Sequence, residues 1–353
     1  MTPRVLFAAG DVGGGRALLP VMEACAARGV SYAAVRHGYF ADHEDLESAV
    51  TPVLSLGRSD PDSVQLPTDV VAFSGSVADT FALSLARRAE TEGLRTLHLL
   101  DNWSSYRRRL EHDGQPMFHP DRYAVMDELA RDAAVEAGVD VATVIITGQP
   151  ALAELATAEV PKRTPGRLRI AFISEPAAQD QGPDPRSPNF RGYTETRVLE
   201  LFCAAAKDVE LEVWIQPHPR EDEELLMAAW QRHRGSLDGK RSPFACGRDA
   251  VLAADAVVGM ASILLYEAWL LGKPVLSIQP ELCQSELRWV GSRPGVFFAD
   301  RSDQVGAAVA EWLAHAARAT RQPQPDLARH QHAPEAVLDA IESLFVVAKG
   351  AAS

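Results

Sequence analysis

The chain has 353 residues, of which 46% are hydrophobic and 24% are charged, a composition typical of a globular protein and a length that favours two domains. Its 35 basic and 48 acidic residues leave a net charge of −13, which argues against nucleic acid as the main partner because phosphate backbones bind to basic surfaces. The four cysteines have no metal-ligand spacing, and no apolar run approaches the ~20 residues of a membrane-spanning helix, so we expect a cytoplasmic protein without a transmembrane segment or a metal.

The first half alternates short apolar runs with amphipathic stretches. A run such as Thr-Val-Ile-Ile-Thr at 143–147 has no polar alternation, which is typical of strands buried on both faces of a parallel sheet. The repeated strand–helix–strand order predicts right-handed crossovers and a doubly wound sheet. We expect strands at 5–9, 32–36, 70–74, 96–100, 123–126 and 144–147, and helices at 16–28, 77–92 and 128–137.

A polar segment with two prolines and a glycine, 161–166, is typical of a linker, and the alternation restarts after it. The later strands are expected at 169–174, 212–216, 256–259 and 275–278, and the helices at 194–207, 221–233, 262–271, 303–318 and 334–347. Between the first of these strands and helices, 176–191 is rich in Pro, Gly, Asp and Gln and is expected to be a long mobile loop.

The pattern therefore predicts an α/β protein of two doubly wound, Rossmann-like domains that face a central cleft. The first domain is expected at 1–160 and the second at 167–320. A linker and helix at 321–353 would complete the chain and return to the first domain.

The first candidate site follows the first strand, where Gly10-Asp11-Val12-Gly13-Gly14-Gly15-Arg16 forms a glycine-rich turn and a helix start. Glycines allow a ligand to approach the backbone closely, and the N–H groups of a helix start attract anions. The spacing is neither G-x-G-x-x-G nor that of a Walker A loop, which argues against a nicotinamide or ATP site. Alternatively, the glycines serve a tight turn and Asp11 bonds to nearby N–H groups.

The second candidate is His218, which follows an apolar strand and is flanked by Pro217 and Pro219. A histidine at a strand end can donate to a phosphate or exchange protons near neutral pH, although a lone histidine is more often structural. Arg220 could pair with a phosphate through its two parallel N–H groups.

The third candidate runs from a strand end at Gly259-Met260 through Ser262 to Glu267, and on to Leu271-Gly272-Lys273-Pro274-Val275. Ser262 fits a helix N-cap, where its hydroxyl and the free N–H groups could hold a phosphate. Glu267 lies five residues further on, in an apolar stretch where a charge needs a partner, and could accept both hydroxyls of a ribose. The bland alternatives are a plain N-cap and a solvated helix face.

These residues resemble the nucleotide-binding domain of the GT-B superfamily, which includes nucleotide-sugar glycosyltransferases and UDP-N-acetylglucosamine 2-epimerases. The resemblance implies that Ser262 and its neighbours at Gly259-Met260 hold the phosphates and that Glu267 holds the ribose. His218-Pro219 is similar to the His-Pro element of capsule and sialic-acid-type transferases and of the epimerases. The glycine run Gly13–Gly15, with Asp11, would face the donor or acceptor from the first domain.

One feature departs from the epimerases. They have a Gly-Asp-Thr element after an early strand, where this chain reads Phe73-Ser74-Gly75-Ser76, and they have a Glu where this chain has Asp101. This departure argues against epimerisation and leaves group transfer as the leading interpretation.

A fourth segment, Asp101-Asn-Trp103-Ser-Ser-Tyr106, is followed by three arginines. Asp101 is a candidate base, and Trp103 and Tyr106 are candidates for stacking on a sugar; equally, the segment could be an N-cap, a packed Trp and a solvated basic face. Glu175, after the strand at 169–174, is a second candidate base.

The leading hypothesis is a metal-independent glycosyltransferase of polysaccharide or glycoconjugate biosynthesis, which transfers a sugar from a CMP- or UDP-linked donor to a sugar-type acceptor and needs no cofactor. His218 and Arg220 would support the leaving phosphate, with His218 counted among the catalytic residues beside Asp101 and Glu175. The alternatives are a nucleotide-sugar 2-epimerase or hydrolase on the same fold, and a non-catalytic nucleotide-sugar-binding or assembly protein.

Overall fold

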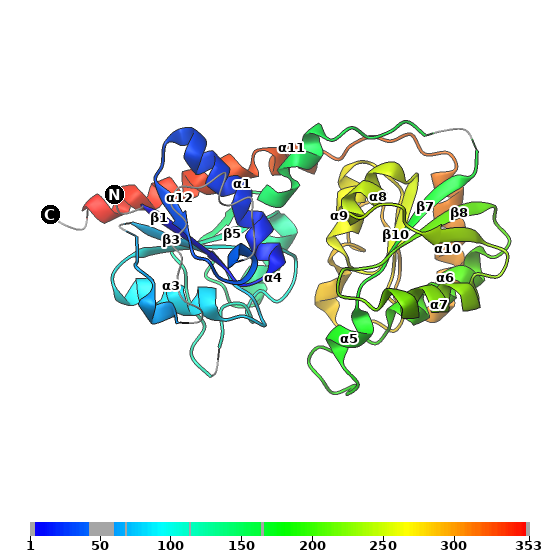
Figure 1. Ribbon diagram of the computed structural model, residues 1–353, viewed down its shortest axis with the longest axis horizontal. Helices are drawn as coiled ribbons and strands as arrows, with labels where there is room; N and C mark the ends of the chain where they lie inside the picture. Colours follow the sequence, from blue (N-terminus) through cyan, green and yellow to red (C-terminus); the bar gives the residue numbers. More distant parts are fainter. Residues whose placement is uncertain (1–3, 42–59, 68, 113, 164–165, 351–353) are drawn as a thin grey trace. The chain divides into compact units, whose positions relative to one another are not determined.

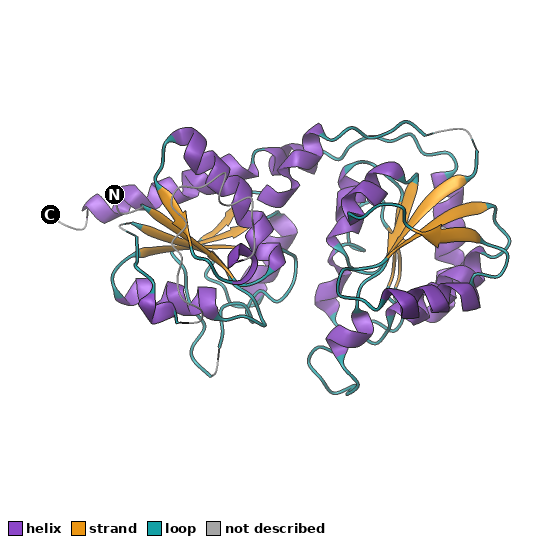
Figure 2. Cartoon of the chain, viewed as in Figure 1, coloured by secondary structure: helices purple, strands orange, loops and turns teal. Residues whose placement is uncertain are grey.

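A computed structural model describes residues 4–41, 60–67, 69–112, 114–163 and 166–350, the last five of them by their backbone only. The chain divides into two compact units (Figure 1). The first comprises 1–157 together with 328–353, and the second comprises 158–327. In the described part of each unit the strands form a six-stranded parallel sheet with helices around it (Figure 2).

The sheet of the first unit has the order β2-β1-β3-β4-β5-β6. Because β1 pairs with β2 on one side and with β3 on the other, the winding of the chain reverses at β1. Every residue of β1 and β3 is buried, as parallel strands covered on both faces require. The strands are β1 (Val5–Ala9), β2 (Tyr32–Ala34), β3 (Val70–Ser74), β4 (Arg95–Leu99), β5 (Arg122–Val125) and β6 (Val144–Ile146).

Helices α1 (Val12–Arg28) and α12 (Ala333–Gly350) lie side by side on one face of this sheet, and α3 (Phe81–Thr91) lies on the other (Figure 1). Leu18 and Val21 of α1 share a buried core with Leu338 and Ile341 of α12 and with β1, β3 and β4. The helix α4 (Glu128–Glu136) connects β5 and β6. The segment from residue 328 onward thus belongs to the first unit, although the second unit separates it in sequence from residues 1–157.

The second unit has the sheet order β12-β11-β10-β7-β8-β9. Its winding reverses at β7, which pairs with β8 on one side and with β10 on the other. Figure 1 shows α6, α7 and α10 on one face and α8 and α9 on the other, and the former pack with the sheet into one apolar core. The strands are β7 (Leu168–Ile173), β8 (Leu211–Gln216), β9 (Asp238–Arg241), β10 (Ala256–Gly259), β11 (Val275–Ile278) and β12 (Phe297–Ala299). The helices are α5 (Ala177–Gln181), α6 (Glu195–Ala206), α7 (Glu223–His233), α8 (Gly247–Ala253), α9 (Ile263–Leu270) and α10 (Val305–Ala316). A further helix, α11 (Asp326–Gln331), spans the boundary between the two units in the sequence.

Short 3-10 helices occur at Gly38–Ala41, Pro61–Ser63, Pro150–Thr157, Ser285–Trp289 and Ser302–Gln304.

Two doubly wound, Rossmann-like sheets confirm the expected fold class. The expectation of a loop throughout 176–191 is wrong, because residues 177–181 form α5. The strand expected at 32–36 ends at Ala34, and β9, β12, α8 and α11 were not expected. Residues 164 and 165 of the expected linker lie outside the described residues. No helix in the described ranges is long and apolar enough to cross a membrane.

Candidate functional site

The carboxyl edge of the second sheet carries the polar residues that follow β7, β8 and β10. Neighbouring connections leave this edge in opposite directions at β7, and open parallel sheets bind ligands at such a point. Glu175, just after β7, accepts a hydrogen bond from the N–H of Ala261, just after β10, at 2.9 Å. Burial raises the pKa of Glu175, although Arg191 and the Ala261 amide oppose the shift. Glu175 therefore lies where the two strands diverge.

His218 is held by a short chain of hydrogen bonds at the end of β8. The carboxylate of Glu221 accepts from the His218 amide at 2.5 Å and from the Ser174 hydroxyl at 2.6 Å. The imidazole Nδ1 accepts from the Arg220 amide at 3.1 Å, which assigns the proton of the neutral ring to Nε2. Burial, and next the Arg220 charge, lower the pKa of His218. At neutral pH the ring therefore offers Nε2–H as a donor.

The side chain of Arg220 is engaged with a carboxylate. It donates to the two oxygens of Asp180 at 2.9 and 3.3 Å, and Arg191 donates to the same carboxylate at 2.9 Å. Asp180 lies in α5, inside the segment that was expected to be a loop. A phosphate that recruits Arg220 would have to take the place of Asp180. The sequence analysis missed Asp180 and Arg191, because nothing in their spacing links them to Arg220.

Ser262 and Glu267 occupy the helix α9 as expected from the sequence. Ser262 is the N-cap, and its hydroxyl accepts from the Leu264 amide at 3.3 Å. Glu267 is only 3% exposed. Arg248 of α8 donates to both of its carboxylate oxygens at 2.9 Å. Arg248 is the partner that a charge in this apolar helix requires, and the sequence analysis did not find it.

Gly259 and Met260, which precede this helix, are both buried. A side chain on Gly259 would overlap the carbonyl oxygen of Ile173 on the neighbouring strand, so glycine is required for the close approach of β10 to β7. The Met260 carbonyl accepts from Ser277 at 2.6 Å and from Gln279 at 3.1 Å. The backbone that leads into α9 is therefore fixed from both neighbouring strands.

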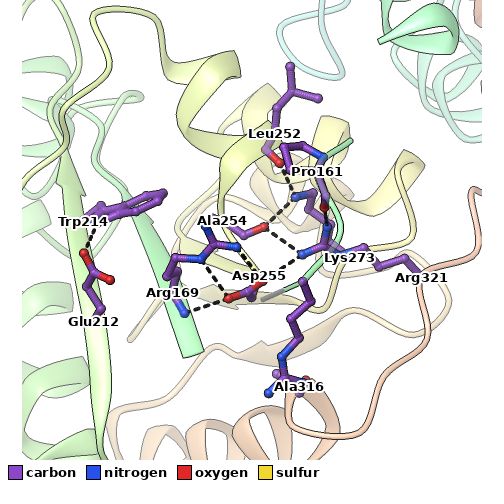
Figure 3. Close-up of polar contacts among 11 residues, drawn as sticks. Pro161, Arg169, Glu212, Trp214, Leu252, Ala254, Asp255, Lys273, Ala316 and Arg321 are labelled. Carbon is purple, nitrogen blue, oxygen red and sulfur yellow. Dashed lines mark hydrogen bonds and ion pairs between the residues drawn. The ribbon is translucent and has the colours of Figure 1, made fainter. Parts of the chain in front are cut away.

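Lys273 lies at the opposite, amino edge of the sheet. Its amine donates to the carbonyls of Leu252 and Ala254 at 2.8 and 2.6 Å, and burial lowers its pKa to about 7 (Figure 3). In the same cluster Asp255 pairs with Arg169 and Arg321, as Figure 3 shows. Lys273 of the Gly-Lys-Pro motif therefore binds carbonyl groups at the C-terminal end of α8 and lies away from the carboxyl edge.

The glycine-rich helix start of the first unit packs against neighbouring strand ends. Asp11 caps α1 by accepting from the Gly14 amide at 2.9 Å. Any side chain on Gly13 would overlap the carboxylate of Asp101, and one on Gly14 would overlap Ser74. A side chain on Gly15 would overlap the ring of Tyr39. The glycines therefore permit close packing at the carboxyl edge of this sheet.

Asp101 follows β4 and is 7% exposed. Arg109 pairs with it at 2.5 Å and also donates to the Gly75 carbonyl at 2.7 Å. Burial raises the pKa of Asp101, although the Arg109 charge opposes the shift. The carboxylate is therefore committed to a buried cation beside the start of α1.

Trp103 and Tyr106 are 1% and 3% exposed. The indole N–H of Trp103 contacts both carboxylate oxygens of Asp127, at 3.0 and 2.9 Å. Neither ring presents a face to a sugar in this arrangement, so contact with an acceptor would require both side chains to move.

The second unit has two cavities on its surface. One, of about 180 Å³, is lined by residues of the β7–α5 connection, by Glu195 and by Glu221. The other, of about 350 Å³, lies between α6 and α7. Within the ranges that the structure describes, no three His, Cys, Asp or Glu side chains gather as a metal site requires.

No protein-family model matches the chain, and no curated protein matches it. Solved structures do. The UDP-GlcNAc 2-epimerase of Methanocaldococcus jannaschii is 12% identical, with a TM-score of 0.63 over 95% of this chain and 99% of that one. MurG of Acinetobacter baumannii is 13% identical, with a TM-score of 0.55 over 97% and 99%, and the glycotransferase of kitacinnamycin is 18% identical, with the same TM-score and shares. The chain is similar to these proteins over 95–97% of its length, and it has the GT-B fold.

Proposed function

We propose that the protein is a glycosyltransferase that transfers a sugar from a nucleotide-activated donor to an acceptor hydroxyl. The observation that carries this proposal is the arrangement on α9, where an N-capping Ser262 and the buried Glu267 lie on one short helix that starts at the winding reversal of the second sheet. A helix start binds phosphate, and a buried carboxylate accepts hydroxyl groups. Together they suit a nucleotide.

In this proposal the second unit binds the nucleotide. The N–H groups at the start of α9, with the Ser262 hydroxyl and the backbone at Gly259-Met260, would hold the phosphates, and Glu267 would accept the ribose hydroxyls. The Nε2–H of His218 would donate to the departing phosphate, because its Nδ1 is already occupied by the Arg220 amide. Arg220 would join it once released from Asp180.

The first unit would supply the acceptor side, with Asp11 and the glycines Gly13–Gly15 at its carboxyl edge. Transfer requires that the acceptor hydroxyl loses its proton as its oxygen bonds to the anomeric carbon and the bond from that carbon to the phosphate oxygen breaks. Asp101 and Glu175 are the proposed bases from the sequence, and each now has a competing partner: Arg109 for Asp101 and the Ala261 amide for Glu175.

We further propose a pyrimidine donor, CMP- or UDP-linked, a sugar-type acceptor, a metal-independent reaction without a cofactor, and a role in cytoplasmic polysaccharide or glycoconjugate synthesis. No nucleic acid partner is proposed, since the net charge is −13.

A second candidate is a nucleotide-sugar 2-epimerase or hydrolase, which is favoured by the similarity to UDP-GlcNAc 2-epimerases. The end of β3 argues against it, because Ser74-Gly75-Ser76 lacks the aspartate that the resemblance implies for the Gly-Asp-Thr element of the epimerases. A non-catalytic nucleotide-sugar-binding protein is the third possibility.

One experiment separates these readings. The protein is incubated with UDP-N-acetylglucosamine or CMP-N-acetylneuraminate, with and without a mixture of monosaccharide acceptors, and the products are identified by mass spectrometry and NMR. A transferase forms a glycoside only with an acceptor. An epimerase inverts the donor sugar without one, a hydrolase releases the free sugar, and no product from either donor in any mixture contradicts both enzyme readings.

A further inference from the structure

A histidine–aspartate pair lies at the carboxyl edge of the first sheet, in a part of the chain that the proposed function does not yet use. His37 follows β2, and Asp79 lies between β3 and α3. The imidazole Nε2 is 2.6 Å from Oδ2 of Asp79. The two residues are 42 positions apart, so the sequence gives no sign that they meet.

The surroundings of the pair hold both side chains in place. The other oxygen of Asp79, Oδ1, accepts from the Phe81 amide at 3.0 Å. The Phe81 ring stacks on the imidazole of His37 with a centroid distance of 4.0 Å and an interplanar angle of 13°. Gly10, at the end of β1, leaves room for Asp79, since a side chain at position 10 would overlap the aspartate. The orientation of the ring is therefore fixed by a hydrogen bond on its edge and an aromatic ring on its face.

This geometry determines which nitrogen of His37 can act as a base. An ionised carboxylate only accepts hydrogen bonds, so Asp79 places the proton on Nε2 and leaves the lone pair on Nδ1. About a quarter of the His37 side chain is exposed, and 29% of Asp79. Within the described residues, no hydrogen bond is made to Nδ1 of His37. A histidine that is oriented by a carboxylate through one nitrogen, and makes no hydrogen bond through the other, is the arrangement that general bases use.

The two candidate bases suggested by the sequence, Asp101 and Glu175, each have a bonded partner on the carboxylate. Asp101 is 7% exposed and bound to Arg109, and Glu175 is bound to the Ala261 amide. A base must reach the hydroxyl from which it takes a proton. The Nδ1 atom of His37 makes no hydrogen bond to another described residue, and a quarter of the side chain is exposed.

We propose that His37 is the catalytic base toward the acceptor and that Asp79 is its positioning residue. This inference rests on the proposed transferase function. It identifies an acceptor hydroxyl as the substrate group on which the first unit acts. Nδ1 of His37 takes the hydroxyl proton, the hydroxyl oxygen forms its bond to the anomeric carbon, and the electron pair of the broken carbon–oxygen bond leaves with the phosphate. The imidazolium, stabilised by Asp79, then returns the proton to water.

The test compares the wild-type protein with H37Q, D79N and the control H119Q, which alters an exposed histidine of the same unit. Glycoside formation is measured with UDP-N-acetylglucosamine and CMP-N-acetylneuraminate in the presence of monosaccharides, and nucleotide affinity is measured with UDP and CMP. Independently of activity, the protonated nitrogen of His37 is read from ¹⁵N NMR of histidine-labelled protein, with the His37 signals assigned by their absence from H37Q.

We expect H37Q to lower kcat by about 100-fold or more at unchanged nucleotide affinity, since a general base contributes about 10²–10⁴-fold. D79N should shift the His37 proton from Nε2 toward Nδ1 and lower kcat by a smaller factor at unchanged nucleotide affinity. A merely structural aspartate would leave kcat of the folded variant unchanged. H119Q should match the wild type.

Transfer by H37Q at the wild-type rate, or an Nδ1–H tautomer in the wild-type protein, overturns the inference and leaves the transferase function standing. A wild-type protein that transfers from neither donor overturns the proposed function, and with it this role of His37.

Discussion

The ion pair between Glu267 and Arg248 allows stability and nucleotide binding to be perturbed separately. In E267Q the pair loses its charge but keeps an oxygen that can accept from Arg248. A hydrogen bond to a charged group contributes about 1.5–3 kcal/mol, and the 26% exposed Arg248 side chain can recover some hydration. We therefore expect a loss of about 2 kcal/mol in the free energy of unfolding. R248M leaves a carboxylate that is only 4% exposed without its cation, which costs about 3–5 kcal/mol.

The order of the two variants in nucleotide affinity should be the reverse of their order in stability. If Glu267 accepts the ribose hydroxyls, E267Q weakens binding of UDP or CMP by about 10- to 100-fold, the equivalent of about 1.4 kcal/mol per factor of ten. R248M keeps the carboxylate and should bind nearly as well as the wild type, despite its larger loss of stability.

Urea unfolding followed by tryptophan fluorescence gives the stabilities, and titration calorimetry gives the affinities. R248K, which keeps the positive charge without the second N–H contact, serves where R248M does not fold. E200Q breaks the exposed Arg197–Glu200 pair and should change stability by less than about 1 kcal/mol and affinity not at all. Equal affinities of E267Q and the wild type would refute the ribose assignment, as would a loss in R248M or R248K as large as that in E267Q.

Three further predictions concern the first unit. Burial lowers the pKa of His98 to about 3, so the unfolded chain binds this proton first as the pH falls through about 6.5. The free energy of unfolding should therefore drop by about 2 kcal/mol between pH 6.5 and pH 5 in the wild type but not in H98Q. Equal drops of the two proteins in urea titrations would contradict this. Arg109→Met should cost about 3–5 kcal/mol because it leaves the buried Asp101 unpaired, and a loss below 1 kcal/mol would show that Asp101 is neutral. Gly13→Ala should lower the free energy of unfolding by about 1–3 kcal/mol, because the new methyl group overlaps Asp101. The matched control Gly306→Ala in α10, where no atom lies near the new methyl group, should raise it by up to about 1 kcal/mol. The same sign in both variants would contradict the packing argument.

The interior strands could be predicted from the sequence because both of their faces are buried. Each residue of β1 and β10 is apolar or glycine and buried, so a continuous apolar run marks these strands. β9 has no such signal. Three of its four residues, Asp238, Lys240 and Arg241, are charged and exposed, and it pairs with β8 at the edge of the sheet. An edge strand of this kind shows no hydrophobic pattern.

Individual site residues could be predicted where the backbone itself sets their place. Ser262 and Asp11 are N-caps, and capping depends on a few consecutive residues. The partners of charged groups could not be predicted, because they come from distant elements. Arg248 reaches Glu267 from another helix, and Asp180 reaches Arg220 across 40 positions.

The aromatic residues Trp103 and Tyr106 illustrate the same limit. Their position after β4 suggested contact with a ligand, but a position near a strand end does not determine whether a side chain turns outward. Asp127, which accepts the indole N–H of Trp103, follows the neighbouring strand β5. Tertiary hydrogen bonding therefore decides the burial of Trp103.

The central claim is that the protein binds a pyrimidine nucleotide, and thermal unfolding of the purified protein with CMP, CDP, UDP, GDP, dTDP and ADP at equal concentrations tests it most directly. A ligand at ~100-fold its dissociation constant adds about 2.7 kcal/mol, which raises Tm by several degrees in a domain of this size. The account predicts a selective increase with a cytidine or uridine nucleotide that is reduced in E267Q. No increase with any of the six at saturating concentration would contradict it.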